Sequence, residues 1–321
     1  MHADSPVVVI CRVLLPAGRD LLAGRGYELR EGGLDVTRER LLELVPGASA
    51  LIPDPAVPID GELLDAAGDQ LKVSANFAVG YDNVDLDACR ERGVIVTNTP
   101  DVLTQATAEL ALALTLAAGR RMSDAERDLR EGRWEGWDPA AYRGLELRGS
   151  TVGVVGMGRI GARYAELVAA LGAEVLYTSR SPKPEAEKAI GARRVELEEL
   201  LSASDVVSVH APASEETHRM IGRAEVDLIG PEGVLVNTSR GPLVDADAVA
   251  DALKEGRLGA AGLDVYEGEP NVPASLLDAP RAVLLPHIGS ATVPSRDGMA
   301  RTAATNAIAV LEGEEPPNRV A

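Results

Sequence analysis

Short apolar runs alternate with amphipathic segments along the first hundred residues. The apolar runs predict strands over 7–15, 49–53, 71–77 and 94–100. The segments between them predict helices over 16–26, 37–47, 60–69 and 83–93. Near-continuous apolar strands that alternate with helices are typical of a parallel sheet covered on both faces. The first third of the chain therefore predicts a small α/β domain.

A longer helical stretch follows, from about residue 101 to residue 131. Its first half, ATAELALALTLAAG, is apolar nearly all round, which predicts burial on most sides, whereas its second half, RRMSDAERDLREG, is polar. The irregular segment after it carries Trp134 and Trp137, in a chain with only 3% aromatic residues. Two large rings in a connecting segment favour a contact surface, with packing beneath the loop as the alternative.

The alternation starts again at Thr151. Strands are predicted over 151–156, 174–178, 205–212, 234–239, 261–266 and 282–288, and helices over 162–172 and 245–257. This pattern is that of a second, doubly wound α/β domain. After Pro294, apolar residues recur with the period of a helix over 295–313, so we expect a last helix there.

Composition narrows the class of partner and the compartment. A chain of 321 residues can form two domains, and a net charge of −18 repels phosphate backbones and anionic lipid, so we expect neither nucleic acid nor membrane as a partner. Cys11 and Cys89 are too few for a disulfide framework and are expected to be structural. The N-terminus lacks a leader pattern, and the most apolar run, Leu110–Gly119, is shorter than the roughly 20 residues of a membrane span. These features favour a cytoplasmic protein.

The segment VGVVGMGRIGARYAELVAALGAEV contains a glycine pattern with a specific context. Gly156, Gly158 and Gly161 form G-x-G-x-x-G directly after a predicted strand and directly before a predicted helix. A dinucleotide site needs this context, because the backbone must approach a pyrophosphate at a helix N-terminus. The pattern predicts dinucleotide binding rather than a merely tight turn.

The next strand ends in Ser179 and Arg180, where a carboxylate is usual in NAD sites. A carboxylate binds the ribose hydroxyls and repels a 2′-phosphate, whereas a hydroxyl and a guanidinium favour that phosphate. Lys183 adds a second positive charge nearby. We therefore expect NADP as the preferred cofactor and NAD as the second choice; a solvated surface arginine is the alternative interpretation.

Three further predicted strands lead to Arg240, Glu269 and His287. Ligands of doubly wound sheets bind beyond the carboxyl ends of the strands, so these side chains are expected to converge. They fit the reduction of a keto acid: arginine holds the substrate carboxylate, histidine gives a proton to the developing alkoxide, and the carboxylate orients the imidazole and keeps it charged. Taken alone, His287 could equally be a structural loop residue. His210 is a weaker candidate that could line the cofactor pocket, His218 is expected to be structural, and no metal-ligand spacing occurs.

Several longer motifs together resemble one enzyme family. ANFAVGYDNVDLDACRERGVIVTNTPDVLTQATAELALAL, LVNTSRGPLVD, AGLDVYEGEP and LLPHIGSAT, with the glycine turn, are similar to the D-isomer-specific 2-hydroxyacid dehydrogenases, and most of all to their glyoxylate/hydroxypyruvate reductase branch. The resemblance implies two doubly wound parallel-sheet α/β domains. One is a Rossmann-type dinucleotide-binding domain at 100–289; the other is a smaller flavodoxin-like substrate-binding domain at 1–99 and 290–321. It also implies a homodimer joined through the long helix and arm at 101–149.

The resemblance carries site residues with it. It implies that Arg240, Glu269 and His287 are catalytic, with His287 as the acid/base. It implies substrate contacts from Arg240, His287, Trp137 and the backbone of Val79 and Gly80. The cofactor contacts that it implies are Thr107, Gly156, Gly158, Arg159, Ile160, Gly161, Ser179, Arg180, Ser181, His210, Pro212, Thr217, Ser239, Asp264 and Gly289.

The expected activity is NAD(P)H-dependent reduction of glyoxylate or hydroxypyruvate to the D-2-hydroxy acid. A 3-phosphoglycerate dehydrogenase or another D-2-hydroxyacid dehydrogenase is the alternative within this enzyme class. From another class, a non-catalytic dinucleotide-sensing protein on the same fold stays open.

Overall fold

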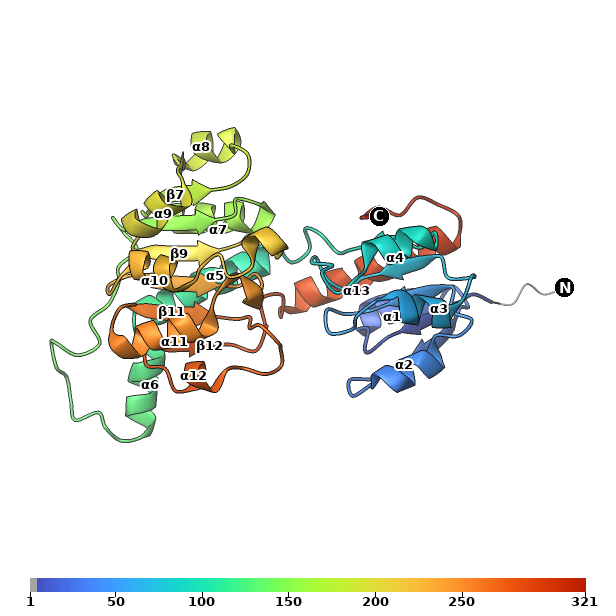
Figure 1. Cartoon of the computed structure of the whole chain (residues 1–321), viewed down its shortest axis with the longest axis horizontal. Helices are drawn as coiled ribbons and strands as arrows, with labels where there is room; N and C mark the ends of the chain where they lie inside the picture. Colours follow the sequence, from blue (N-terminus) through green and yellow to red (C-terminus); the bar gives the residue numbers. More distant parts are fainter. Residues whose placement is uncertain (1–4) are drawn as a thin grey trace. The chain divides into compact units, whose positions relative to one another are not determined.

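The computed structural model describes residues 5–321 and contains two compact units (Figure 1). One unit is the chain up to Leu103 together with Ala291–Ala321, and the other is Thr104–Ser290. The sequence placed the two boundaries between the units after residues 99 and 289. In the structure they fall after Leu103 and after Ser290.

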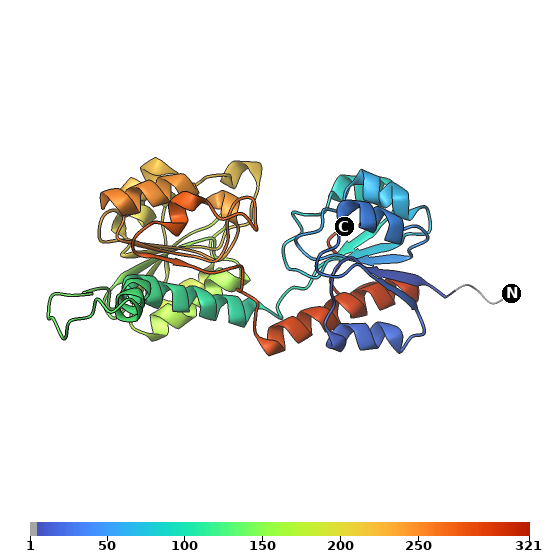
Figure 2. The same ribbon diagram turned by 90° about the horizontal axis from the view of Figure 1, so that it is seen from below.

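The first unit is built on a five-stranded parallel sheet with the order β2-β1-β3-β4-β5. Its strands are β1 (Val7–Ile10), β2 (Glu28–Glu31), β3 (Ala50–Ile52), β4 (Val73–Ala75) and β5 (Ile95–Thr97). Its helices are α1 (Pro16–Ala23), α2 (Arg38–Leu44), α3 (Gly61–Ala67), α4 (Leu86–Glu91) and α13 (Val293–Leu311). The strand order is that of flavodoxin-like folds. Figure 2 shows α1 and α13 on one face of this sheet and the other three helices on the opposite face.

The last helix, α13, belongs to this first unit. It crosses α1 so closely that a Cβ on Gly18 would lie 2.2 Å from the carbonyl oxygen of Ala300. Two side chains fasten it to the segment after β5: Ser295 Oγ donates to Val102 O at 3.0 Å, and Asn306 Nδ2 donates to Asn98 O at 3.0 Å. The C-terminal segment is therefore an integral layer of the N-terminal unit.

The second unit is built on a seven-stranded parallel sheet with the order β12-β11-β10-β9-β6-β7-β8. Its strands are β6 (Thr151–Val155), β7 (Glu174–Thr178), β8 (Arg193–Arg194), β9 (Val206–Val209), β10 (Val234–Asn237), β11 (Ala260–Leu263) and β12 (Ala282–Leu284). Counted from β6, this is the 3-2-1-4-5-6 order of the Rossmann fold with one more strand at the edge. The predicted fold class, two doubly wound parallel-sheet domains, is confirmed.

Helices cover both faces of the second sheet (Figure 2). One face carries α5 (Thr104–Gly119) and α7 (Arg159–Ala170), and the apolar cluster beneath them includes Tyr164 and Tyr177, both fully buried. The other face carries α9 (Leu197–Ala203), α10 (Arg223–Ile229) and α11 (Ala246–Glu255). The remaining elements are α6 (Met122–Arg130), α8 (Pro184–Ile190), α12 (Ala274–Leu277) and the 3₁₀ turns η1 (Glu215–Thr217) and η2 (Gly241–Leu243).

The stretch expected as one helix over 101–131 is two helices. Helix α5 ends at Gly119, Arg121 adopts a φ of 53°, and α6 begins at Met122. The buried carboxylate of Asp124 fixes the start of α6, because it pairs with Arg121 and Arg127 and accepts the backbone N–H of Arg281. The polar second half therefore starts a separate element at a tertiary contact that the local sequence does not encode.

Two other features bear on the expected class of protein. No helix within residues 5–321 is long and apolar enough to cross a membrane. Cys11 and Cys89 are buried free thiols, and burial raises their pKa values to about 12 and about 11.

Candidate active site

The glycine turn after β6 leaves room for a ligand at the start of α7. Gly156 has a φ of 97°, and a Cβ there would lie 2.7 Å from the backbone nitrogen of Ala211. A Cβ on Gly161 would lie 2.1 Å from Gly156 O, whereas a Cβ on Gly158 would meet open space. The turn is thus tight on its protein side and open at the N-cap of a 12-residue helix, whose first N–H groups lack intrahelical partners. This geometry fits a dinucleotide pyrophosphate, with Arg159 and Ile160 in the first helical turn.

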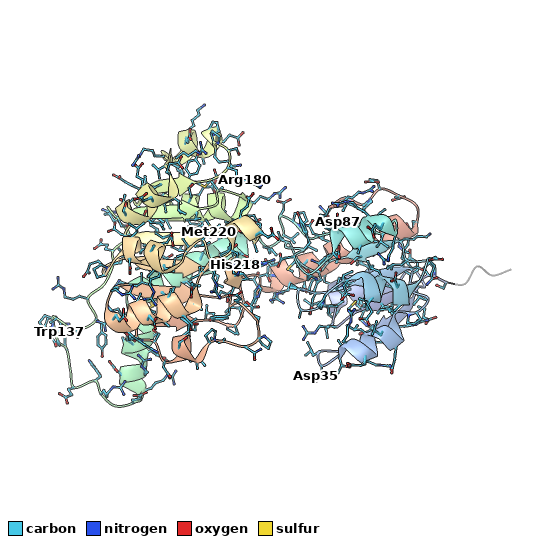
Figure 3. The ribbon with its side chains drawn as sticks, in the orientation of Figure 1. Asp35, Asp87, Trp137, Arg180, His218 and Met220 are labelled. Carbon is cyan, nitrogen blue, oxygen red and sulfur yellow. The ribbon has the colours of Figure 1, made fainter. Side chains whose placement is uncertain are left out.

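The loop after β7 presents no carboxylate at the position where an NAD site usually has one. Ser179 Oγ donates to Ser181 O at 2.6 Å, and the Arg180 side chain is exposed near the carboxyl end of the strand (Figure 3). An exposed guanidinium here can meet a 2′-phosphate, whose oxygens match its planar fork of donors. The loop therefore offers a hydroxyl and a guanidinium, and no carboxylate, at this position.

The loops after β9 and β10 are tied to one another beside the glycine turn. Ser239 Oγ donates to Ala211 O at 2.5 Å, and Thr217 Oγ1 donates to Pro212 O at 2.8 Å. His210 Nε2 lies 2.9 Å from Ser208 Oγ, and burial lowers the pKa of this imidazole to about 3. His210 is therefore neutral at physiological pH, which suits a pocket wall and excludes it as the proton donor.

His287 and Glu269 form the closest acid–base contact of this sheet edge. His287 Nδ1 lies 2.6 Å from Glu269 Oε2, and Glu269 Oε1 accepts the N–H of Tyr266 at 2.9 Å. Burial alone would raise the pKa of Glu269, but the hydrogen bonds from His287 and Tyr266 and the positive charge of Arg240 hold this pKa below its usual value. Glu269 is thus a carboxylate that fixes the imidazole through Nδ1 and leaves Nε2 for a substrate.

Asp264 holds the backbone of the His287 loop. His287 has a φ of 54°, which is uncommon for a side chain with a Cβ. Asp264 stabilises it with three contacts: its carbonyl accepts from His287 N at 2.9 Å, and its carboxylate oxygens accept from Ile288 N at 2.8 Å and Gly289 N at 2.7 Å. Burial raises the pKa of Asp264 despite these donors. Thr107 lies on α5, and its Oγ1 donates to Gly289 O at 3.3 Å. The predicted residues Thr107, Asp264 and Gly289 therefore lie together.

Arg240 starts from an equally constrained turn. The buried amide of Asn237 bridges it, since Nδ2 donates to Arg240 O at 2.9 Å and Oδ1 accepts from Ser239 N at 3.0 Å. A Cβ on Gly241 would lie 1.9 Å from the carbonyl carbon of Tyr266, so the turn after β10 lies directly against the loop that leads to Glu269. Asn237 and Gly241 were not among the sequence candidates. Their positions beside Arg240 in NTSRG were the available signal.

In the first unit, two asparagines fix the loop that contains Val79 and Gly80. Asn98 Nδ2 donates to Val79 O at 2.8 Å, and the buried Asn76 donates to Gly80 O at 2.7 Å. With their carbonyls held in this way, the two residues have a fixed peptide orientation. These asparagines were also absent from the sequence candidates.

Trp137 lies on the arm between α6 and β6, residues 131–150 (Figure 3). It lies apart from the loops at the carboxyl ends of the strands of the second sheet. Its side chain is 85% exposed and that of Trp134 is 59% exposed, so neither ring packs beneath the loop within this chain. The base of the arm is fastened, because Tyr142 donates to Asp128 of α6 at 2.6 Å. Packing beneath the loop, the alternative to a contact surface, is therefore wrong.

His218 forms a second, more exposed histidine–carboxylate pair. Its Nε2 lies 3.2 Å from Glu267 Oε1, and Arg219 also pairs with this carboxylate at 3.3 Å. These contacts lower the pKa of Glu267. An open hollow of about 520 Å³ beside the pair is lined by Ala213, Ser214, Glu215 and His218. Within residues 5–321, no group of three or more His, Cys, Asp or Glu side chains could hold a metal ion.

A glycine turn binds a dinucleotide but carries no reaction by itself. Beyond the carboxyl ends of the same sheet lie a guanidinium and an imidazole, and a carboxylate holds the imidazole. Reduction of a carbonyl by hydride transfer uses groups of these kinds, to bind the substrate and to donate the proton. The protein is therefore an oxidoreductase that uses a nicotinamide dinucleotide.

Comparison with known proteins identifies the family. The model for the D-isomer specific 2-hydroxyacid dehydrogenase, NAD binding domain, matches residues 112–289. The chain is 48% identical over 284 residues to a glyoxylate reductase of Thermococcus litoralis, covering 87% of this chain and 86% of that protein. The chain belongs to the D-isomer specific 2-hydroxyacid dehydrogenase family.

Solved structures agree over nearly the whole chain. The crystal structure of the TT0316 protein from Thermus thermophilus is similar with a TM-score of 0.92 and 45% identity, covering 98% of this chain and all of that chain. An NADPH-dependent glyoxylate/hydroxypyruvate reductase from Sinorhizobium meliloti, in complex with NADP and malonate, is similar with a TM-score of 0.85 and 35% identity, covering 98% and 97%.

Proposed function

We propose that the protein reduces glyoxylate to glycolate and hydroxypyruvate to D-glycerate with NAD(P)H. The observation that carries this proposal is the His287–Glu269 contact of 2.6 Å beside Arg240, in a chain 48% identical to a glyoxylate reductase. Arg240 supplies a partner for the substrate carboxylate, and the Rossmann-type unit supplies a site for the dinucleotide.

The residues of the chain divide the reaction between them. The bound reduced nicotinamide supplies a hydride to the carbonyl carbon. His287 donates the proton from Nε2 to the carbonyl oxygen, so that hydride and proton together give the alcohol. Glu269 stabilises the imidazolium and orients it through Nδ1. Arg240 binds the substrate carboxylate by charge-assisted hydrogen bonds. In the first unit, the fixed backbone of Val79 and Gly80 offers N–H donors for a substrate.

Cofactor oxidation with a panel of small 2-keto acids tests this function. We expect the highest kcat/KM with glyoxylate and hydroxypyruvate, and a lower value with larger keto acids and with 3-phosphohydroxypyruvate, because a net charge of −18 opposes a substrate with an added phosphate. Absence of turnover with every keto acid, together with retained NADPH binding, would favour a dinucleotide-sensing protein instead.

The preferred cofactor of the proposal is NADP, and it rests on Ser179, Ser181 and Arg180. Arg180→Ala should lower the ratio of kcat/KM with NADPH to that with NADH by about tenfold to a hundredfold, since one charge-assisted hydrogen bond is worth about 1.5–3 kcal/mol. Arg193→Ala is the control. Arg193 lies on the neighbouring strand β8, and its exposed guanidinium pairs with Glu199 of α9. An unchanged ratio in Arg180→Ala would show that this side chain does not contact the 2′-phosphate.

The protein is further proposed to act as a homodimer joined through α5, α6 and the arm. Four large apolar side chains of α6 and the arm are more than half exposed: Met122, Leu129, Trp134 and Trp137. Such a group of exposed apolar residues is typical of an interaction surface.

The acidic surface supports the absence of nucleic-acid and membrane partners, and the free thiols of Cys11 and Cys89 support a reducing, cytoplasmic location.

In the reductase branch that the sequence resembles, a tryptophan of the neighbouring subunit reaches into the substrate pocket, and we propose this role for Trp137. Trp137→Ala tests it. We expect the ratio of kcat/KM for hydroxypyruvate to that for glyoxylate to change by about threefold or more, because the larger substrate has more surface for an indole to cover. The fold of the chain should stay intact, which circular dichroism measures, since within one chain this side chain is 85% exposed. Trp134→Ala on the same arm is the matched control, and sedimentation measures the dimer. Unchanged selectivity in Trp137→Ala would remove this residue from the pocket.

A further inference from the structure

The hydroxyl group of Tyr177 closes the loop that contains Ser179 and Arg180. Tyr177 lies in β7 and is fully buried. Its Oη accepts the backbone N–H of Lys183 at 2.8 Å and donates to Glu187 Oε1 at 2.6 Å. Both partners follow the loop, so a single hydroxyl ties the far end of the loop back to the strand from which it starts.

Arg194 of the edge strand β8 holds the near end of the same loop. Its Nε and Nη2 donate to Ser179 O at 3.2 Å and 2.9 Å. The backbone supports this contact, because β8 pairs with β7 and Val195 N donates to Tyr177 O at 2.9 Å. A guanidinium that donates two hydrogen bonds to one carbonyl fixes the direction of that peptide, and the next residue in the chain is Arg180.

The same hydroxyl also holds a negative charge. Glu187 is the acidic side chain that Tyr177 binds, and its position on α8 brings it back toward the loop. A carboxylate released near a 2′-phosphate would repel that group. Loss of the hydroxyl therefore has two effects with the same sign: it loosens the loop and frees a repelling charge.

We propose that Tyr177 and Arg194 are positioning residues for cofactor choice, which hold the loop between β7 and α8 so that Ser179 and Arg180 receive the 2′-phosphate. This inference rests on the proposed preference for NADP. It concerns residues that contact the loop rather than the cofactor, so it separates the arrangement of the loop from the charge that the loop carries.

Tyr177→Phe tests the proposal with a binding readout. The ratio of the dissociation constants of 5′-AMP and adenosine 2′,5′-bisphosphate, measured by equilibrium titration, reports the 2′-phosphate contact without any hydride transfer. We expect this ratio to fall about two- to tenfold, the range for loss of one neutral hydrogen bond. Tyr164→Phe is the matched control, since Tyr164 is also fully buried in the same unit and its hydroxyl bonds Thr115 at 2.8 Å. The control should leave the ratio within about twofold.

Arg194→Lys and Arg194→Ala separate positioning from direct charge, and they also serve if Tyr177→Phe does not fold. Lysine keeps the positive charge but cannot donate two fixed hydrogen bonds to one carbonyl, so both variants should lower the ratio. Recovery of the parent ratio in Arg194→Lys would overturn the positioning role of Arg194. An unchanged ratio in Tyr177→Phe, with Arg180→Ala lowering it, would overturn the inference alone. An unchanged ratio in Arg180→Ala as well would overturn the NADP preference on which it rests.

Discussion

His287→Gln lowers kcat/KM for glyoxylate reduction by about 10²- to 10⁴-fold at every pH, which is the usual contribution of a positioned general acid. Glutamine keeps a polar group of similar length at the end of β12 but cannot give up a proton to a developing alkoxide. A lower pH cannot supply the missing proton donor, so the activity of the variant should not recover in acid. The measurement is a pH profile of kcat/KM between about pH 5 and pH 9.

The chain offers a matched control for this substitution. His218 also lies beside a carboxylate of the same sheet edge, 3.2 Å from Glu267, and His218→Gln should keep kcat/KM within about threefold of the parent. The dissociation constant of NADPH should be the same in both variants, since neither change touches the glycine turn. A His287→Gln enzyme with near-parental activity would mean that another group protonates the carbonyl oxygen.

Glu269→Gln moves the alkaline limb of the same profile to lower pH, by about one unit or more. The sign follows from the charge. The hydrogen bonds and positive charges around Glu269 hold its pKa below the usual value, so it is ionised throughout the neutral range and its negative charge stabilises the imidazolium of His287. An imidazole in water titrates near pH 6.5, so only about a tenth would carry the proton at pH 7.5 without this help. Glutamine keeps the shape but removes the charge, and much of the activity should return in acid.

Glu267→Gln is the control for this prediction. Glu267 lies two residues earlier on the same loop and pairs with His218 and Arg219, so its loss changes the local charge by the same amount. The alkaline limb of Glu267→Gln should stay near that of the parent. An alkaline limb of Glu269→Gln that coincides with the parental one would assign Glu269 some task other than holding the protonated imidazole.

The sequence predicted the buried strands well and missed two of the four edge strands, β2 and β8. Strand β2, with the sequence ELRE, has no fully buried residue, and β8 consists of the exposed pair Arg193–Arg194. A central strand of a parallel sheet is apolar because helices cover both of its faces, whereas an edge strand can be polar and still pair. Only the neighbouring strand, β1 or β7, makes these segments extended.

The candidate site divides in the same way. The glycine turn and the set of Arg240, Glu269 and His287 could be predicted, because each follows a strand and carries the chemistry in its own side chain. The contacts that hold them were not predicted. Asn237, which holds the turn of Arg240, was not a sequence candidate. Asp264 was expected as a cofactor contact, but its hold on the backbone of the His287 loop, 24 residues away along the chain at Ile288, is a tertiary contact that a pattern along the chain does not reveal.

The sequence by itself determined the two α/β domains and the position of the glycine turn, and it proposed Arg240, Glu269 and His287 as the reacting groups, because periodicity, glycine spacing and side-chain chemistry are local properties. The tertiary structure alone decided the break between α5 and α6 and the closure of the Ser179–Arg180 loop by Tyr177. It also gave the distance of 2.6 Å for the expected contact between His287 and Glu269. The break depends on Asp124 and Arg281, which are 157 residues apart along the chain. The hydroxyl of Tyr177 meets Lys183 and Glu187 only when the segment after β7 folds back onto the strand.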